Sequence, residues 1–131
     1  MLRALVFCAL ALGSSASHAA PLSADAFEAY TTGKTLYFSE DGEIYGAERY
    51  MPGRRVEWSF LDGQCKSGEW YADGPAICFV YEDRPDPQCW EFERTATGLR
   101  ATFMGDAQST ELYEAEQVGE PLYCVGPKVG V

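Results

Sequence analysis

Turn-forming pairs recur along the chain at intervals of about eight to twelve residues, and this spacing constrains the fold more than any other feature. Asp41-Gly42, Asp62-Gly63 and Asp73-Gly74 are typical of tight turns between antiparallel strands, and Pro52-Gly53 marks a further turn. The stretches between the turns are too short for helices of ordinary length. The chain from Thr35 onward is therefore predicted to be an antiparallel β protein.

Apolar and polar residues alternate with period two between these turns, most clearly over residues 55–61. One face of this strand is expected to lie in a core and the other in water. Gly46, in the preceding strand, predicts a bulge or a bend. The predicted inward set is Val56, Trp58 and Phe60, and the outward set is Arg55, Glu57 and Ser59.

Eight such strands follow one another with short connections, at 35–39, 43–51, 55–61, 64–71, 76–82, 88–94, 99–104 and 111–116. An up-and-down meander of this size protects its edges best by closing into a small barrel. The inward candidates are mostly bulky, so we expect a packed interior with at most a shallow pocket at the mouth. They are Leu36, Phe38, Val56, Trp58, Phe60, Trp70, Phe79, Trp90, Phe92 and Phe103.

A short helix is predicted over residues 22–30, ahead of the strands. Ser23 is a good N-cap and Gly33 a good terminator. A helix of about two turns is not stable alone, so it should lie on the β structure. Phe27 and Tyr30 are its expected buried side.

Residues 1–19 have the pattern of a signal peptide, because the apolar run 4–13 is too short to span a bilayer. Small residues at Ser17 and Ala19 predict cleavage after Ala19. Residues 20–131 then form one domain, which we expect in the periplasm or secreted, without membrane insertion.

Four cysteines remain in the predicted mature chain, and an even count in an exported protein indicates disulfides. Four cysteines allow three pairings. A local bridge from Cys78 to Cys89, within one hairpin, leaves Cys65 to pair with Cys124 and tie down the tail. The spacings lack a Cys-x-x-Cys pair, so no metal site is expected.

The net charge is −10 for the whole chain, and removal of Arg3 with the signal peptide gives 9 − 20 = −11. Nucleic acids and anionic membranes require a basic face, so this balance argues against both as partners. The admissible partners are a cationic protein or a small apolar ligand. We expect a monomer that needs no cofactor.

Histidine-assisted catalysis is excluded for the mature chain, because the one histidine, His18, lies in the predicted signal peptide. Carboxylate chemistry, as in glycoside hydrolysis, stays open. No acid stands out as catalytic. The acids considered are Glu40, Asp41, Glu43, Asp83, Asp86, Glu91, Glu93, Glu111, Glu114, Glu116 and Glu120.

The chain resembles a loose group of small exported bacterial β-domain proteins of unknown function. The resemblance covers most of the predicted mature chain and implies the same fold but no activity. It is carried by Gly33-Lys34-Thr35-Leu36, Gly46-Ala47-Glu48-Arg49-Tyr50, Gly68-Glu69-Trp70-Tyr71, Ile77-Cys78-Phe79 and Gln88-Cys89-Trp90.

A second resemblance, to the periplasmic lysozyme inhibitors, is carried by Ser67-Gly68-Glu69-Trp70-Tyr71, which matches their Ser-Gly-x-x-Tyr motif. It implies an inhibitor loop of Ser67, Gly68 and Tyr71, with the serine entering the lysozyme cleft. The family's second motif, a downstream Tyr-x-x-x-Thr-Lys-Gly, is missing here.

The sequence favours an exported, non-catalytic binding or interaction module. Its alternatives are an inhibitor of lysozyme and a small carboxylate-dependent hydrolase. The hydrolase alternative requires two acids that face each other in a pocket.

Overall fold

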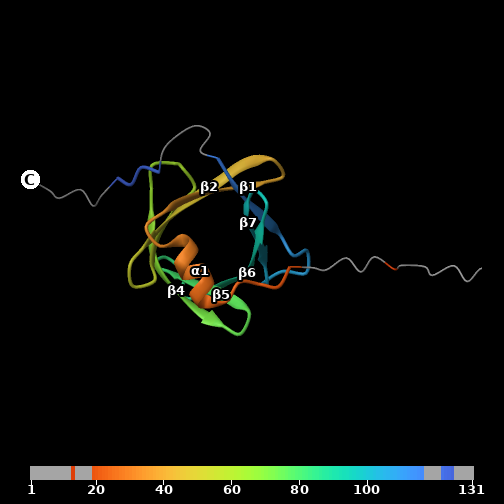
Figure 1. The fold of residues 1–131 in the computed structure, drawn as a ribbon. Helices are drawn as coiled ribbons and strands as arrows, with labels where there is room; N and C mark the ends of the chain where they lie inside the picture. The colour runs from red at the N-terminus through yellow and green to blue at the C-terminus, as the bar shows by residue number, and fades with distance from the viewer. Residues whose placement is uncertain (1–12, 14–18, 117–121, 126–131) are drawn as a thin grey trace, which may run out of the picture.

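The protein forms a closed barrel of eight antiparallel strands with one short helix at its end (Figure 1). The computed structural model describes residues 13, 19–116 and 122–125, so most of the predicted signal peptide, 1–19, lies outside the described residues. Each strand pairs with the next in sequence, and β8 pairs with β1, which confirms the predicted meander. The elements are α1 (Ala24–Thr31), β1 (Thr35–Glu40), β2 (Glu43–Met51), β3 (Arg55–Ser59), β4 (Lys66–Asp73), β5 (Ala76–Tyr81), β6 (Gln88–Thr95), β7 (Gly98–Phe103) and β8 (Glu111–Ala115).

The first hairpin shows why the predicted turns form. Asp41 and Gly42 have φ angles of 48° and 83°, so both central residues adopt the left-handed conformation. A two-residue turn of this kind matches the twist of the strands that it joins. β1 and β2 consequently pair up to Glu40 and Glu43.

The end of β3 differs from the prediction. The strand stops at Ser59 rather than Leu61. Ser59 is predicted to face water but is buried. Its hydroxyl can be buried because it donates to the Gln64 carbonyl oxygen at 2.7 Å and accepts from the Leu61 N–H at 3.0 Å. A buried hydroxyl with its hydrogen bonds satisfied is stable. Phe60, predicted to be inward, opens the following loop and is 47% exposed.

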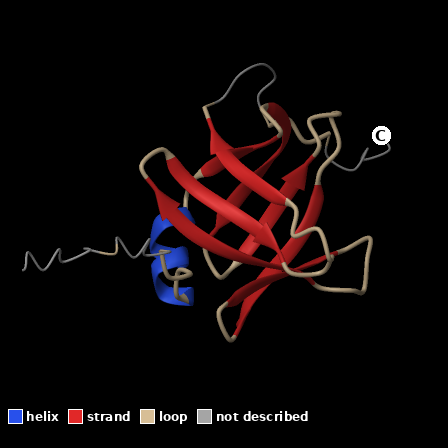
Figure 2. Cartoon of the chain, turned by 90° about the vertical axis from the view of Figure 1, so that its right-hand side faces the viewer, coloured by secondary structure: helices blue, strands red, loops and turns tan. Residues whose placement is uncertain are grey.

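Helix α1 closes one end of the barrel (Figures 1 and 2). Ser23 is the N-cap, as predicted, and its Oγ accepts from the Ala26 N–H at 3.2 Å. Phe27 is fully buried, whereas Tyr30 is half-buried and donates from its hydroxyl to Glu114 at 2.7 Å. The Phe27 ring meets the rings of Tyr50, Trp70, Phe79 and Phe92, with centroids 4.5 to 6.3 Å away.

A β-bulge interrupts the pairing of β1 with β2. Phe38 pairs with Gly46 and Ser39 pairs with Ile44, so Tyr45 is the extra residue. The bulge predicted at Gly46 is thus present. It lets the Tyr45 ring contact Trp58, with centroids 5.7 Å apart.

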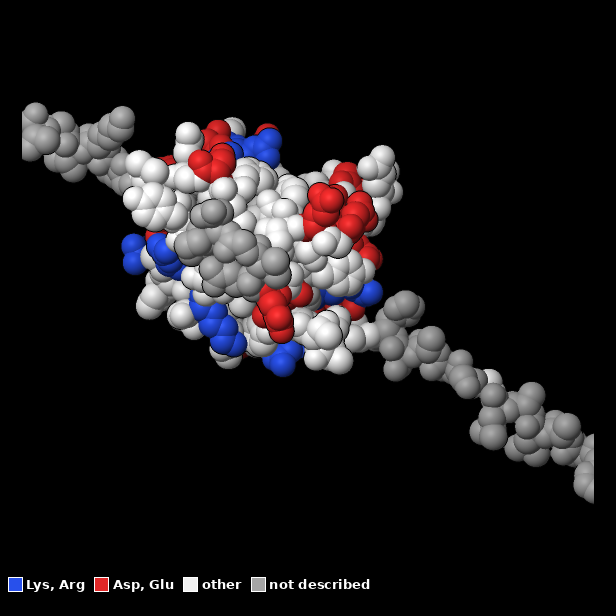
Figure 3. Space-filling model, turned by 90° about the horizontal axis from the view of Figure 1, so that it is seen from above, with Lys and Arg blue, Asp and Glu red and all other residues white. Residues whose placement is uncertain are grey.

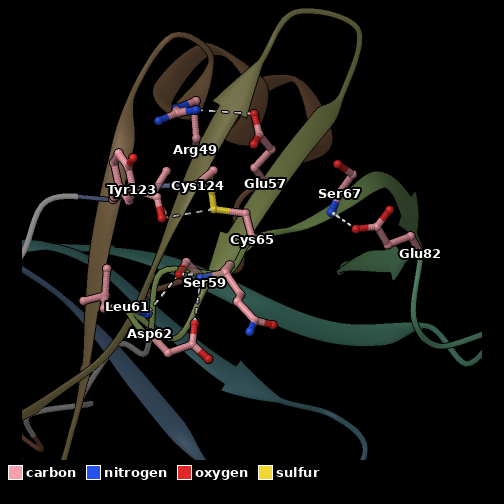
Figure 4. Close-up of a disulfide and its surroundings, with 12 residues drawn as sticks. Arg49, Glu57, Ser59, Leu61, Asp62, Cys65, Ser67, Glu82, Tyr123 and Cys124 are labelled. Carbon is pink, nitrogen blue, oxygen red and sulfur yellow. Dashed lines mark hydrogen bonds and ion pairs between the residues drawn. A yellow bond between two sulfur atoms is a disulfide. The ribbon is translucent and has the colours of Figure 1, made fainter. Parts of the chain in front are cut away.

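Both expected disulfides are present. Cys78 and Cys89 join β5 to β6 at directly paired positions, and Cys65 joins the β3–β4 loop to Cys124 in the described C-terminal segment (Figure 4). Disulfides persist in oxidising compartments, which places the folded chain in such a compartment. Among the described residues, no helix is long and apolar enough to cross a membrane.

Candidate ligand-binding cavity

The barrel end opposite α1 opens to solvent. In an antiparallel meander the connections alternate between the two ends, so the β1–β2, β3–β4, β5–β6 and β7–β8 connections share this end. A cavity of about 110 Å³ runs into the barrel from it. Tyr45, Phe60 and Asp83 line the cavity and are exposed, and they mark its mouth.

The cavity is deeper than the shallow pocket that the bulky inward residues predicted. Phe92, Ala101 and Leu112 are buried residues that line it. Space remains because one inward position of β7 carries only the methyl group of Ala101. The complete lining is Phe38, Tyr45, Glu48, Tyr50, Trp58, Phe60, Lys66, Phe79, Tyr81, Asp83, Arg84, Gln88, Trp90, Phe92, Ala101 and Leu112.

Glu48 is the buried acid of this cavity. It lies in β2 and is 3% exposed, and its Oε2 accepts a hydrogen bond of 2.6 Å from the Tyr81 hydroxyl. Burial raises the pKa of Glu48 to about 8, although hydrogen bonds from Tyr81 and Tyr50 oppose the rise. At neutral pH, without a charged partner, Glu48 is therefore mainly a neutral carboxylic acid.

Sequence reasoning did not single out Glu48, although the bounds of its strand, 43–51, were correct. The alternation of residues in β2 nevertheless contains a pattern that identifies Glu48 as an inward-facing acid. Period two puts Glu48 on the same face of β2 as Tyr50, and both residues are buried. Assigning that face as inward would have predicted an acid inside an aromatic barrel.

Three aromatic side chains form the rim of the mouth, and we call Tyr45, Trp58 and Phe60 the aromatic rim. Their ring centroids lie 5.4 to 5.7 Å from one another. Lys66 lies beside them, with its Nζ 5.3 Å from the Phe60 ring centroid and 2.7 Å from Asp83 Oδ2. The mouth thus already holds one ammonium group between an aromatic face and a carboxylate.

Acidic residues dominate the open end, where the basic residues of the described part are Lys66, at the start of β4, and Arg84, in the β5–β6 connection. The end closed by α1 carries Lys34, Arg54, Arg55 and Arg94. On the face in Figure 3, the largest group of acidic side chains lies toward the upper right, and basic side chains lie mainly toward the left and lower edges. We call the acids of the open end the acidic mouth: Glu40, Asp41, Glu43, Asp62, Glu82, Asp83, Asp86, Asp106 and Glu111.

The predicted inhibitor residues lie in a strand rather than a loop. Ser67, Gly68 and Tyr71 belong to β4, which pairs with β3 and β5. Ser67 and Tyr71 are both exposed, and the Ser67 N–H donates to Glu82 Oε1 at 3.1 Å (Figure 4). The motif is therefore accessible, but the sheet holds its backbone.

One group of three potential metal ligands exists within the described part of the chain. Glu57, Cys65 and Cys124 have ligand atoms within 4.8 Å of one another. The two sulfurs form a disulfide, so they are not thiolates. Glu57 is also paired with Arg49, at 3.4 Å (Figure 4).

Fold and site together define a small, disulfide-linked β-barrel with an internal cavity that opens opposite its helix. No protein-family model, curated protein or solved structure matches the chain.

Proposed function

We propose that this chain is an exported, non-catalytic binding module that takes a small, largely apolar ligand into its barrel. The observation that carries the proposal is the cavity of about 110 Å³, with aromatic walls and, among the described residues that line it, one buried acid at Glu48. Ligand sites are typically concave and mostly apolar, with a few polar groups that orient the ligand. An engineered cavity of about 150 Å³ binds benzene, so this one suits a group of slightly smaller size.

A signal peptide over 1–19 and a periplasmic or secreted location belong to the same proposal. The two disulfides support an oxidising compartment. Mass spectrometry of the exported protein tests the signal peptide, because cleavage after Ala19 gives a chain that begins at Ala20.

Native mass spectrometry of protein exported to a periplasm, compared with the denatured mass of the same sample, tests the binding function. Extra native mass that is lost on denaturation identifies a bound small molecule. A bare protein that also shows no thermal shift with any member of a broad small-molecule library overturns the proposal.

A cavity-filling variant sharpens this test. Ala101→Leu places three more carbons in the cavity and should abolish ligand retention. Ala72→Leu adds the same atoms at an exposed position of β4 and should leave retention unchanged. Equal retention by both variants would place the ligand outside the barrel.

Inhibition of lysozyme is a second candidate, favoured by the exposure of Ser67 and Tyr71 together on β4. The acidic mouth would also attract a cationic enzyme. This candidate requires the purified protein to slow lysozyme at micromolar concentration, and Ser67→Ala to relieve the inhibition.

A hydrolase would need two free carboxyl groups facing each other. Glu48 and Asp83 are the acids of the cavity lining. Asp83 is held by Lys66 at the mouth, which lowers the pKa of its carboxyl, and Glu48 is held by Tyr81. Because each of the two acids already has its own partner, the site favours ligand binding over catalysis.

A further inference from the structure

Acidic groups outnumber free basic groups along the cavity, and this limits the chemical class of ligand that it can bind. The inference rests on the ligand-binding function proposed above. The inner wall of the cavity carries Glu48, and its outer edge lies within the acidic mouth. The basic residues that line it are Lys66, already paired with Asp83, and the exposed Arg84. A carboxylate ligand would meet the acids without a free cation deep in the cavity.

We infer that the cavity binds a small organic cation, with a protonated amine against the Glu48 carboxylate and an apolar body against the aromatic rim. Aromatic faces attract ammonium groups, and they do so more strongly where water is excluded. Lys66 shows this chemistry at the mouth, since its ammonium lies over Phe60 and beside Asp83. A ligand amine would find the same two components deeper in the barrel.

The geometry sets the size of the ligand. Tyr45 at the mouth and Glu48 in the wall are three residues apart along β2, which sets an upper bound of about 10 Å on the depth, because the bulge at Tyr45 and the tilt of barrel strands both shorten it. An amine at Glu48 therefore has a body of at most that length before it reaches solvent. A primary amine on a short unbranched chain, such as hexylamine, can place its ammonium at Glu48 while the rest of its chain extends toward the aromatic rim and the open mouth.

Proton linkage supports the assignment. The titratable groups against Glu48 are the hydroxyls of Tyr50 and Tyr81, whose pKa values are raised well above 10.0 by burial. The partners of Glu48 on β1 and β3 are Leu36 and Trp58, which carry no charge. Among the described residues, no cation lies against Glu48. A bound ammonium would therefore favour the ionised carboxylate, and Glu48 would release its carboxyl proton on binding.

The pH dependence that follows has a definite sign. With the pKa of Glu48 at about 8, the affinity for hexylammonium should rise about tenfold per pH unit up to pH 8 and then level off. An alkylamine stays protonated across this range, as lysine does. A neutral ligand that accepts a hydrogen bond from protonated Glu48 would show the opposite trend.

Titration with hexylamine, hexanol and hexanoate tests the inference, because the three probes share one apolar chain and differ in charge. Calorimetry gives the affinities, and the fluorescence of Trp58 and Trp90, which line the cavity, reports occupancy. We expect hexylammonium to bind at least about tenfold more tightly than the other two at pH 8. Glu48→Gln should remove that preference, whereas Glu69→Gln, at an exposed acid of β4, should keep it.

Three results would overturn the inference. Hexanol binding as tightly as hexylammonium, or Glu48→Gln binding hexylammonium like the wild type, would show that charge at Glu48 is not used, although the barrel would still bind ligands. If none of the three probes binds, the cation class is rejected. The proposed ligand-binding function would still stand if the wild type retains a native ligand and Ala101→Leu does not.

Discussion

The Tyr81 hydroxyl donates a hydrogen bond of 2.6 Å to Glu48 Oε2 inside the barrel, and it joins β5 to β2 across the interior. The two residues are far apart in sequence and belong to strands that do not pair. The hydrogen bond orients the one buried acid of the cavity. Aromatic residues surround the carboxyl, and this burial raises its pKa, which affects both the stability of the fold and the binding of a cation.

The wild-type protein should lose stability as the pH rises from about 4.5 to about 8. The pKa of Glu48 is raised from 4.5 to about 8 by burial, so in this window the folded state binds a proton that the unfolded state has lost. The stabilising contribution of protonated Glu48 is fully present below pH 4.5. It is lost as the pH rises, and the loss is of order 5 kcal/mol across the window. Urea unfolding of wild type and Glu48→Gln at several pH values measures this, and equal slopes in the two proteins would contradict it.

Phe27→Ala should cost about 3 to 5 kcal/mol, because the fully buried ring closes the barrel end against four other aromatic rings. Phe60→Ala is the matched control at the open end, where the ring is 47% exposed, and should cost about 1 kcal/mol or less. Urea unfolding compares the two. Similar costs would mean that α1 does not anchor the fold as the structure indicates.

Gly46→Ala should destabilise the barrel by about 1 to 3 kcal/mol through overpacking. A Cβ atom at this position would lie 2.6 Å from the Ser59 carbonyl oxygen and would overlap the Trp58 ring. The shift of Trp58 should appear in the fluorescence spectrum. In a Trp58→Leu background the cost should shrink, and an unchanged cost would show that the ring is not the obstacle.

Removal of either disulfide by paired Cys→Ala changes should destabilise the protein. In the chain-entropy model the Cys78–Cys89 bridge, with a separation of 11, contributes about 3 kcal/mol, and Cys65–Cys124, with a separation of 59, about 4 kcal/mol. Thermal unfolding of the two double variants measures the difference. An unchanged melting temperature would show that the bridge concerned does not stabilise the fold.

Much of the architecture was predictable because local signals carry it. The strand at 43–51 was predicted with its bounds correct, and the bulge at Gly46 and the cap at Ser23 were read from single residues. The end of β3 was not predictable. The alternation continues through Phe60, but the strand ends where Ser59 hydrogen-bonds to the following loop and Leu61 adopts a left-handed backbone with a φ of 62°.

The sequence by itself determined a meander of eight strands and its helix, because turn chemistry and period-two patterning are local properties. It supplied four cysteines in the predicted mature chain but left their three possible pairings open. Only the tertiary structure decided which acid lies inside the barrel and which barrel end is open. Glu48 becomes distinctive through Tyr81 on another strand, and the cavity exists because Phe27 fills one end while Ala101 leaves space nearer the other. Burial and electrostatic environment depend on residues brought together from distant parts of the chain, and no single segment encodes them.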